Sequence, residues 1–262
     1  RMAAASGARK KTEGSTVLDC AALMEWMQRG GLDSLPAGIS QLRASKFSKG
    51  QSNPTFLVEA LGPAATEPLA RWVLRKKPHG KLLRSAHDVE REFIVQRALR
   101  ATGVPVAEML AFCADDRVLG TQFYLMEFVR GRVFTDPSLP ELCAEERTEV
   151  YKQLASAMAK LHAVEPSDVG LQNFSRGEGQ HSRRQIERWG KQYMSDWGSK
   201  PHPKMMEVLR WLQGHCPPQG STLEGRIVHG DFKMDNMVFH PTQPRLLAIL
   251  DWELSTIGTQ SM

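Results

Sequence analysis

Long apolar runs are missing from this 262-residue sequence. The densest run, residues 246–250, has the length of a strand, whereas a membrane-spanning helix needs about 20 apolar residues. The sequence also lacks G-x-S-x-G, G-x-G-x-x-G and G-x-x-x-x-G-K-[ST], which are the signatures of α/β-hydrolases, Rossmann folds and P-loop proteins. We therefore predict no membrane span, and these three enzyme classes lose their sequence support.

Cysteine is scarce and charge is dispersed. The four cysteines form no C-x-x-C pair, so their spacing argues against a zinc module or a disulfide framework and suits reduced thiols. The 34 Lys and Arg exceed the 29 Asp and Glu by only five, and they form no basic run. RNA-binding domains carry aromatic-studded strands, and none is evident here. We therefore expect no nucleic-acid partner.

The two ends of the sequence have compositions of their own. Residues 1–18 are small, polar and basic, with Glu13 as the only acid, which favours a flexible linker or tail over the transit peptide they also resemble. The sequence starts at Arg1, and residues 259–262 follow soon after an apolar strand. From these features we expect a piece of a longer product, with a truncated C-terminal lobe.

Between the ends, two compositions alternate. Residues 19–129 contain β-branched and aromatic runs at 56–58, 72–74 and 123–126, with a helix expected at 88–101. We interpret this part as a β-rich, nucleotide-binding N-terminal lobe.

The remainder, residues 130–262, is predicted to be a helical catalytic lobe. An apolar stripe with helical spacing marks one helix (Val150, Leu154, Ala157, Met158 and Leu161). Segment 170–203 is rich in Gly, Ser, Arg and His and is expected to be a surface excursion, after which short apolar strands return. The two lobes together predict an α+β, bilobal architecture.

The most informative stretch is HGDFKMDN, residues 229–236. Asp231 and Asn236 lie five residues apart on a loop between two short strands, and a second apolar strand then leads to Asp251. Phosphoryl transfer needs a carboxylate that orients a hydroxyl and takes its proton, together with oxygen ligands for Mg²⁺. We assign the catalytic role to Asp231 and the metal to Asn236 and Asp251. The alternative is an ordinary Asp- and Asn-rich surface turn.

Candidate phosphate anchors lie in the β-rich lobe. The backbone of residues 48–53 could cover phosphates, and its candidate contacts are Ser48, Lys49, Gly50 and Ser52. A plain hairpin turn is the competing interpretation.

A strand cation and a helix carboxylate could complete the nucleotide site. On the strand at 72–77, Val73 shares a face with Arg75. We prefer Arg75 over Lys76 as the phosphate ligand, with Val73 roofing the base. Glu92, on a partly apolar helix stripe, would pair with Arg75 if buried. The alternatives are a strand end whose cations reach water and an exposed glutamate.

The apolar strand at 123–131 offers a backbone that could hydrogen-bond an adenine, through Glu127 and Val129. Judged without its context, it is only a core strand.

Six blocks together resemble a known family: FSKGQSNPTFLVE, WVLRKKPHGKLL, EREFIVQRAL, FYLMEFVRGRVF, IVHGDFKMDNMVFHP and AILDWELSTIG. From about residue 40 to 258 they are similar to the aminoglycoside phosphotransferase-like kinase domain, in the form fused to acyl-CoA dehydrogenases. The resemblance implies a bilobal protein-kinase-like fold with an incomplete C-terminal lobe, ATP and Mg²⁺ as cofactors, and a small hydroxylated acceptor.

The same resemblance narrows the acceptor to a hydroxy fatty acid or its CoA ester in fatty-acid catabolism. It also implies fused hydrolase-like and acyl-CoA dehydrogenase domains and a mitochondrial parent protein; without it, a cytoplasmic location is the default. The competing hypothesis is a truncated, catalytically inactive nucleotide-binding or structural fragment.

Overall fold

The computed structural model describes residues 17–47, 53–63, 66–78, 88–175, 181–198, 200–216 and 225–259. The chain divides into two compact units. Unit 1 comprises Arg1–Glu90 and Met109–Phe128, and unit 2 comprises Arg91–Glu108 and Val129–Met262. The sequence had put residues 91–108 in the β-rich lobe. They belong to unit 2 because α2 (Val89–Leu99) and the loop after it bury apolar side chains in the unit 2 core.

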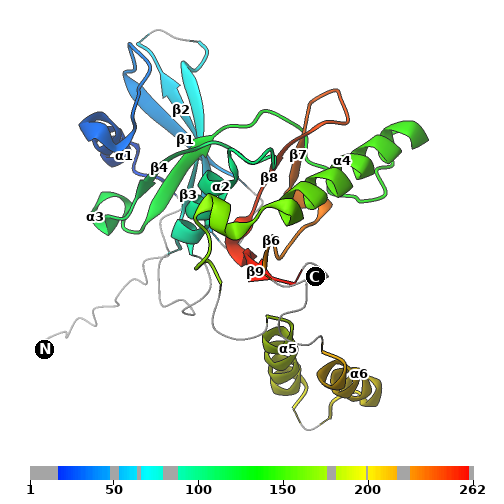
Figure 1. Cartoon of the computed structure of the whole chain (residues 1–262). Coiled ribbons are helices and arrows are strands. Elements are labelled where there is room, and N and C mark those ends of the chain that lie inside the picture. The colour runs from blue at the N-terminus through cyan, green and yellow to red at the C-terminus, as the bar shows by residue number, and fades with distance from the viewer. Residues whose placement is uncertain are drawn as a thin grey trace, which may run out of the picture. The chain divides into compact units, whose positions relative to one another are not determined.

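A five-stranded antiparallel sheet forms the centre of unit 1 (Figure 1). Its strand order is β1-β2-β3-β5-β4. The strands are β1 (Gln41–Lys46), β2 (Thr55–Leu61), β3 (Ala70–Lys76), β4 (Met109–Cys113) and β5 (Phe123–Glu127). The three runs predicted as strands at 56–58, 72–74 and 123–126 lie within β2, β3 and β5.

One face of this sheet is covered by helix. Asp19 caps α1 (Cys20–Trp26) by accepting hydrogen bonds from the backbone of Ala21 and Ala22, and a π-type turn, η1 (Met27–Gly31), follows. Apolar side chains of α1, of η1 and of the short α3 (Asp116–Leu119) pack on those of β2, β3 and β5. Burial of this apolar area stabilises unit 1.

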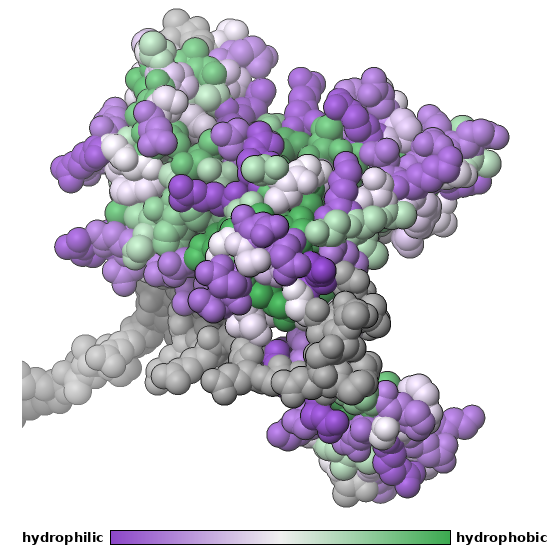
Figure 2. Space-filling model, in the orientation of Figure 1, coloured by the Kyte–Doolittle hydropathy of each residue, from purple (hydrophilic) through white to green (hydrophobic). Residues whose placement is uncertain are grey.

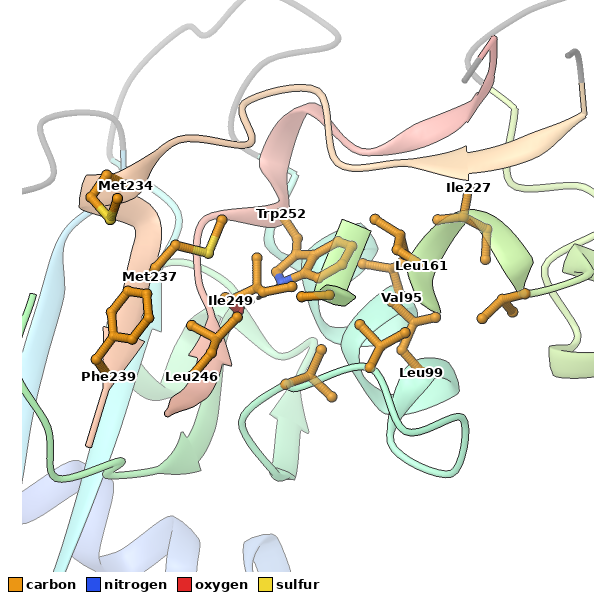
Figure 3. Packing of buried hydrophobic residues seen from close by; sticks show 14 of the residues in the cluster. Val95, Leu99, Leu161, Ile227, Met234, Met237, Phe239, Leu246, Ile249 and Trp252 are labelled. Carbon is orange, nitrogen blue, oxygen red and sulfur yellow. Dashed lines mark hydrogen bonds between the residues drawn. The ribbon is translucent and has the colours of Figure 1, made fainter. Parts of the chain in front are cut away.

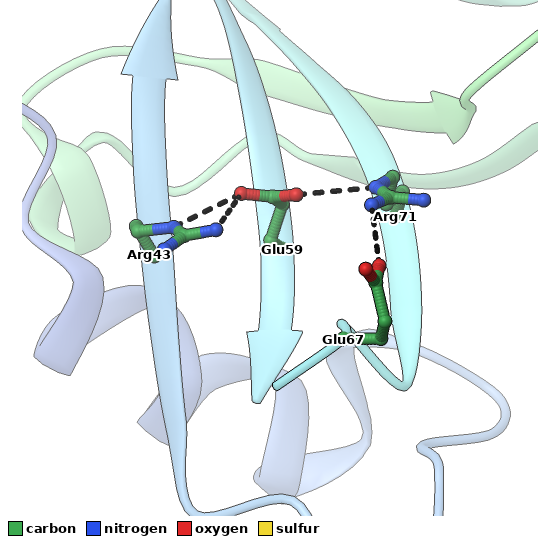
Figure 4. A network of polar contacts seen from close by, with 4 residues as sticks. All are labelled: Arg43, Glu59, Glu67 and Arg71. Carbon is green, nitrogen blue, oxygen red and sulfur yellow. Dashed lines mark hydrogen bonds and ion pairs between the residues drawn. The ribbon is translucent and has the colours of Figure 1, made fainter. Parts of the chain in front are cut away.

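The opposite face of the sheet carries charge. Arg43, Glu59 and Arg71 lie side by side on β1, β2 and β3 (Figure 4), and both guanidinium groups donate to the Glu59 carboxylate at 2.7–3.1 Å. Hydrogen bonds from Arg43, and then from Arg71, hold the pKa of the Glu59 carboxyl below its usual range. These three residues therefore lie outside the apolar cluster that packs on α1.

Among the described residues, unit 2 combines helices with two small two-stranded sheets. In the antiparallel pairs, β6 (Arg226–Val228) joins β9 (Thr256–Gly258), and β7 (Met237–Phe239) joins β8 (Leu246–Ile249). Three 3₁₀ turns lie in this unit: η2 (Pro166–Val169), η3 (Met234–Asn236) and η4 (Trp252–Leu254).

The core of unit 2 surrounds Trp252, whose side chain is fully buried among Val95, Leu161, Ile249 and their neighbours (Figure 3). The long helix α4 (Ala144–Ala163) supplies the predicted apolar stripe, with Val150, Ala157 and Leu161 buried. Met158, which we had placed in that stripe, is 36% exposed. Its position lies about 80° around the helix from Val150, at the edge of the buried face.

Segment 170–203, which we predict to be a surface excursion, is largely helical. Much of it is α5 (His181–Trp197), which packs against α6 (Pro203–Gly214). Neither helix, nor any other in the described ranges, combines the length and apolar composition needed to cross a bilayer.

Candidate active site

The loop from β6 to β7 brings two of the predicted site residues together. The side-chain amide of Asn236 donates to the Asp231 carboxylate at 3.0 Å and to the Asp231 carbonyl oxygen at 2.9 Å. Asn236 is buried, while the Asp231 side chain is 35% exposed. The amide nitrogen is therefore used to orient Asp231, which leaves the amide oxygen of Asn236 as the group suited to a cation.

Asp251 is brought to this loop through its neighbour Leu250. The Leu250 N–H donates to the Asn236 carbonyl at 2.8 Å, and the Leu250 carbonyl lies 2.9 Å from the His229 Nε2. Asp251 itself adopts φ 64° and ψ 61°, a left-handed conformation that is uncommon for residues with a side chain. Two fixed hydrogen bonds and an unusual backbone turn thus position this carboxylate at the end of β8.

His229 connects Asp231 to Leu250, the residue before Asp251. Its Nδ1 accepts a hydrogen bond from the Asp231 N–H at 3.2 Å, so Nε2 carries the proton that is donated to Leu250. The ring is 2% exposed and lies edge-on to Trp252 at 4.5 Å between centroids. Burial lowers the pKa of His229, which suits a neutral ring with one donor and one acceptor.

Gly230 allows the loop to turn this closely. Its φ is +84°, and a Cβ there would lie 2.5 Å from the Leu254 carbonyl oxygen. A side chain would therefore be both strained and obstructed at this position.

Lys233 places a positive charge beside Asp231. Its Nζ lies 3.1 Å from Asp231 Oδ2 and 3.8 Å from Asp235 Oδ2. The contact with Asp231 raises the pKa of the lysine, and the charge of Asp251 contributes in the same direction. Because both Asn236 and Lys233 contact Oδ2, Oδ1 is the Asp231 oxygen suited to an acceptor hydroxyl.

Sequence reasoning gave no role to His229 or Lys233, although both lie inside the motif. Burial of the ring and its two hydrogen bonds are the features that point to His229. Both depend on the fold, so a short sequence motif does not reveal them.

The predicted metal ligands have suitable chemistry. A carboxylate and an amide oxygen are hard donors, as Mg²⁺ requires, and Mg²⁺ commonly completes its shell with phosphates and water. The described residues contain no group of three or more His, Cys, Asp or Glu that could hold a metal ion. A cation at Asn236 and Asp251 would therefore depend on a nucleotide for further ligands.

The structure separates the two candidate cations of β3. Val73 and Arg75 share the sheet face opposite the apolar core, with Arg75 beside Tyr124 of β5. Lys76 lies on the core side, where its Nζ donates to the Leu119 carbonyl oxygen at 2.8 Å and burial lowers its pKa. Lys76 is thus engaged away from Arg75, and Arg75 is the better candidate phosphate ligand.

The remaining predicted nucleotide contacts are distributed between the units. Arg75 in unit 1 and Glu92 in unit 2 are 8% and 0% exposed, and the ion pair between them stays a prediction. Glu127 ends β5, while Val129 begins the long segment of unit 2. The predicted anchors Ser48, Lys49, Gly50 and Ser52 lie outside the described residues.

The comparison with known families covers the residues of this loop. Residues 43–261 match the group described as "Phosphotransferase enzyme family". The chain belongs to this family. The matched range includes Asp231, Asn236 and Asp251, so these predicted site residues lie in the part of the chain that matches the family.

Members of the phosphotransferase enzyme family with similar sequences occur inside longer proteins. The Arabidopsis thaliana protein named "Probable acyl-CoA dehydrogenase IBR3" is 47% identical over 234 residues, which are 87% of this chain and 28% of that protein. "Acyl-CoA dehydrogenase family member 10" of Mus musculus is 41% identical over 213 residues, 81% of this chain and 19% of that protein. The chain thus spans about a quarter of the length of these relatives or less.

Solved structures agree with the fold. A candidate aminoglycoside phosphotransferase from Ralstonia eutropha has 42% identity and a TM-score of 0.77, covering 93% of this chain and 67% of that chain. The ternary complex of streptomycin, ATP and APH(2")-IIa has 18% identity and a TM-score of 0.60, covering 93% and 73%. The predicted α+β, protein-kinase-like fold of the aminoglycoside phosphotransferases is confirmed.

Proposed function

We propose that this phosphotransferase domain moves the γ-phosphoryl group of ATP to a hydroxyl group of a small molecule, with Asp231 as the catalytic base. The observation that carries the proposal is the pair of hydrogen bonds from the Asn236 amide to Asp231, one to its carboxylate and one to its backbone. A related fold whose structure was solved with ATP and streptomycin supports the choice of donor and acceptor class.

In this mechanism the residues of the loop divide the work. Asp231 Oδ1 accepts the hydrogen bond of the acceptor hydroxyl and takes its proton as the new O–P bond forms and the bond to the β-phosphate oxygen breaks, releasing ADP. Asn236 and His229 fix the carboxylate and its backbone. Such positioning, together with charge stabilisation, supplies most of the rate in phosphoryl transfer.

A cation is expected to assist at Asn236 and Asp251. When bound there, Mg²⁺ would neutralise and orient the nucleotide phosphates. Arg75, paired with Glu92, would neutralise phosphate charge, since a guanidinium binds phosphate as a fork. Val73, Glu127 and Val129 would contact the nucleotide base, and the 48–53 loop would cover the phosphates.

The acceptor is proposed from the names of the relatives. Because similar domains occur in proteins named as acyl-CoA dehydrogenases, we propose a hydroxy fatty acid or hydroxyacyl-CoA acceptor. A fused dehydrogenase and a mitochondrial parent protein belong to the same proposal.

The test is formation of ADP from ATP and Mg²⁺ with a panel of hydroxyacyl-CoA and hydroxy fatty acids. Asp231→Asn should lower turnover by about 10²–10⁴-fold yet retain the thermal stabilisation that ATP gives. The matched control is Asp235→Asn, a carboxylate of the same loop whose closest recorded cation is Lys233 at 3.8 Å; its turnover should stay within about twofold of wild type.

Equal turnover in Asp231→Asn and wild type would contradict the role of Asp231 as the catalytic base. Nucleotide binding by wild type without any turnover would favour the inactive, nucleotide-binding hypothesis instead.

A further inference from the structure

The first turn of α2 carries two charged side chains away from solvent. Figure 2 shows hydrophilic residues spread over the visible surface of the protein, which is where Arg and Glu are usually found. On α2, however, Arg91 is only partly exposed and Glu92 is fully buried. Burial of a charged side chain is unfavourable unless a well-placed partner compensates it. The contacts of these two neighbours are therefore informative.

Arg91 contacts one residue in two ways. Its Nη2 donates to the carbonyl oxygen of Phe174, and its Cζ lies over the Phe174 ring, 3.9 Å from the centroid. The planar guanidinium is better suited than an ammonium to combine a hydrogen bond with a cation–π contact. Because the two contacts constrain the group in different directions, together they fix its position.

Phe174 is itself held in place. It is 6% exposed and packs in the core cluster of unit 2. Its N–H donates to the Leu171 carbonyl oxygen at 2.9 Å, and the Leu171 N–H donates to the Pro166 carbonyl oxygen at 2.7 Å. Arg91 therefore ties the first turn of α2 to a segment that follows α4, 83 residues further along the chain.

Glu92 follows Arg91 directly, so its position depends on the same turn of the helix. Its carbonyl oxygen accepts a hydrogen bond from Gln96 Nε2 at 3.2 Å. Packing of Val95 and Leu99 in the unit 2 core holds the second half of α2, whereas the boundary between the two units falls just before Arg91. Arg91 thus holds the beginning of the helix, where Glu92 lies.

We propose that Arg91 is a positioning residue for nucleotide binding: through Phe174 it fixes the first turn of α2 and, with it, the carboxylate of Glu92. This inference rests on the proposed function, in which Glu92 pairs with Arg75 and Arg75 binds the phosphates of ATP. A displaced Glu92 would leave Arg75 less well oriented, and binding weakens when a ligand must order the group that contacts it.

The experiment measures the affinity of the 262-residue chain for ATP with Mg²⁺ by titration calorimetry. Arg91→Met removes both contacts with Phe174 and should weaken ATP binding about 3–30-fold. In a Glu92→Gln background the same substitution should change the affinity less than about twofold, because its effect passes through Glu92. The matched control is Arg97→Met, at an exposed position of α2, which removes the same charge and should stay within about twofold of wild type.

Two milder variants keep the inference testable if Arg91→Met does not fold. Arg91→Lys keeps the positive charge, and Phe174→Leu keeps the carbonyl oxygen and an apolar side chain while removing the ring. Each should weaken ATP binding less than Arg91→Met, and neither should weaken it further in the Glu92→Gln background.

Equal ATP affinity of wild type and the variants at Arg91 and Phe174 would overturn the inference. Losses that add up in the double variants would do the same, because Arg91 would then not act through Glu92. So would an equal loss in Arg97→Met. Absence of ATP binding by wild type would contradict the proposed function itself, and the inference with it.

Discussion

In the loop from β6 to β7 the polar side chains bond to one another and to nearby backbone, whereas the α5–α6 hairpin exposes many of its apolar side chains. His229, Asp231, Asn236 and Leu250 form a closed ring of hydrogen bonds, and the His229 ring lies edge-on to the buried Trp252. In α6 no residue is buried. The difference shows where each region obtains its order: the loop packs on the core of unit 2, whereas α5 and α6 pack closely on each other at Gly190 and Leu209.

The two tryptophans at the centre of these regions give the largest expected contrast. Trp252→Ala removes a fully buried ring and should lower the free energy of unfolding by about 3–5 kcal/mol. Trp189→Ala, at 60% exposure, should change it by less than about 0.5 kcal/mol. Urea unfolding measures both, and similar losses would contradict the contrast.

His229→Gln should have the next largest effect. It disturbs hydrogen bonds to Asp231 and Leu250, at a cost of about 1–3 kcal/mol. Because the folded pKa lies below the ordinary value of 6.5, the neutral ring stabilises the fold above that pH, and this contribution is lost as the pH falls towards the folded pKa.

The measurement is the free energy of unfolding between pH 8 and pH 5 (about the range in which histidine titrates). The pH dependence should flatten in His229→Gln. The control is His162→Gln on α4, where burial also lowers the pKa of a less buried ring. An unchanged pH dependence in His229→Gln would contradict the assigned tautomer and burial.

Gly190→Val tests how the hairpin is built. The added side chain meets Leu209, so α5 and α6 should separate at a local cost of about 1–2 kcal/mol. Amide exchange should become faster in both helices, with no change in the catalytic loop. The control is Ser195→Val, at an exposed position away from the groove between α5 and α6. Equal changes of amide exchange in the two variants would contradict the close contact between Gly190 and Leu209.

Lys233→Met should have the smallest effect on stability. The lysine is about half exposed, and surface ion pairs contribute about 0–1 kcal/mol. The free energy of unfolding should therefore change little. The affinity for ATP relative to ADP can then be used to detect a contact between Lys233 and the nucleotide phosphates. A large loss of stability would show that the ion pair with Asp231 holds the loop together.

The sequence predicted some parts of the structure well, and for clear physical reasons. Strand cores such as Phe56 and Val58 combine β-branched or aromatic side chains with burial, and α4 carries a regular apolar stripe. The motif spacing correctly placed Asp231 near Asn236, because the two residues lie only five positions apart on the short loop that joins β6 to β7.

Other parts depend on contacts that are distant in sequence. The alternation of side chains along a strand correctly placed Arg75 and Lys76 on opposite faces of the sheet, but it does not tell which face packs on the helices. Lys76 lies on that face, where it donates to the carbonyl oxygen of Leu119, a residue 43 positions away. The bounds of α5 could not be predicted, because its Gly, Ser, Arg and His content obscures the helical spacing of Ile186, Trp189 and Tyr193. The grouping of 91–108 with unit 2 depends on packing that composition does not reveal.

The most direct test of the central claim is a titration of the chain with Mn²⁺ and ATP, followed by the electron paramagnetic resonance of Mn²⁺. Wild type should bind one Mn²⁺ with the nucleotide, Asp251→Asn should weaken that binding at least about tenfold since a carboxylate ligand is lost, and Asp235→Asn should bind as wild type does. Equal binding by wild type and Asp251→Asn would contradict the claim that Asp231, Asn236 and Asp251 form a cation-dependent phosphotransfer site.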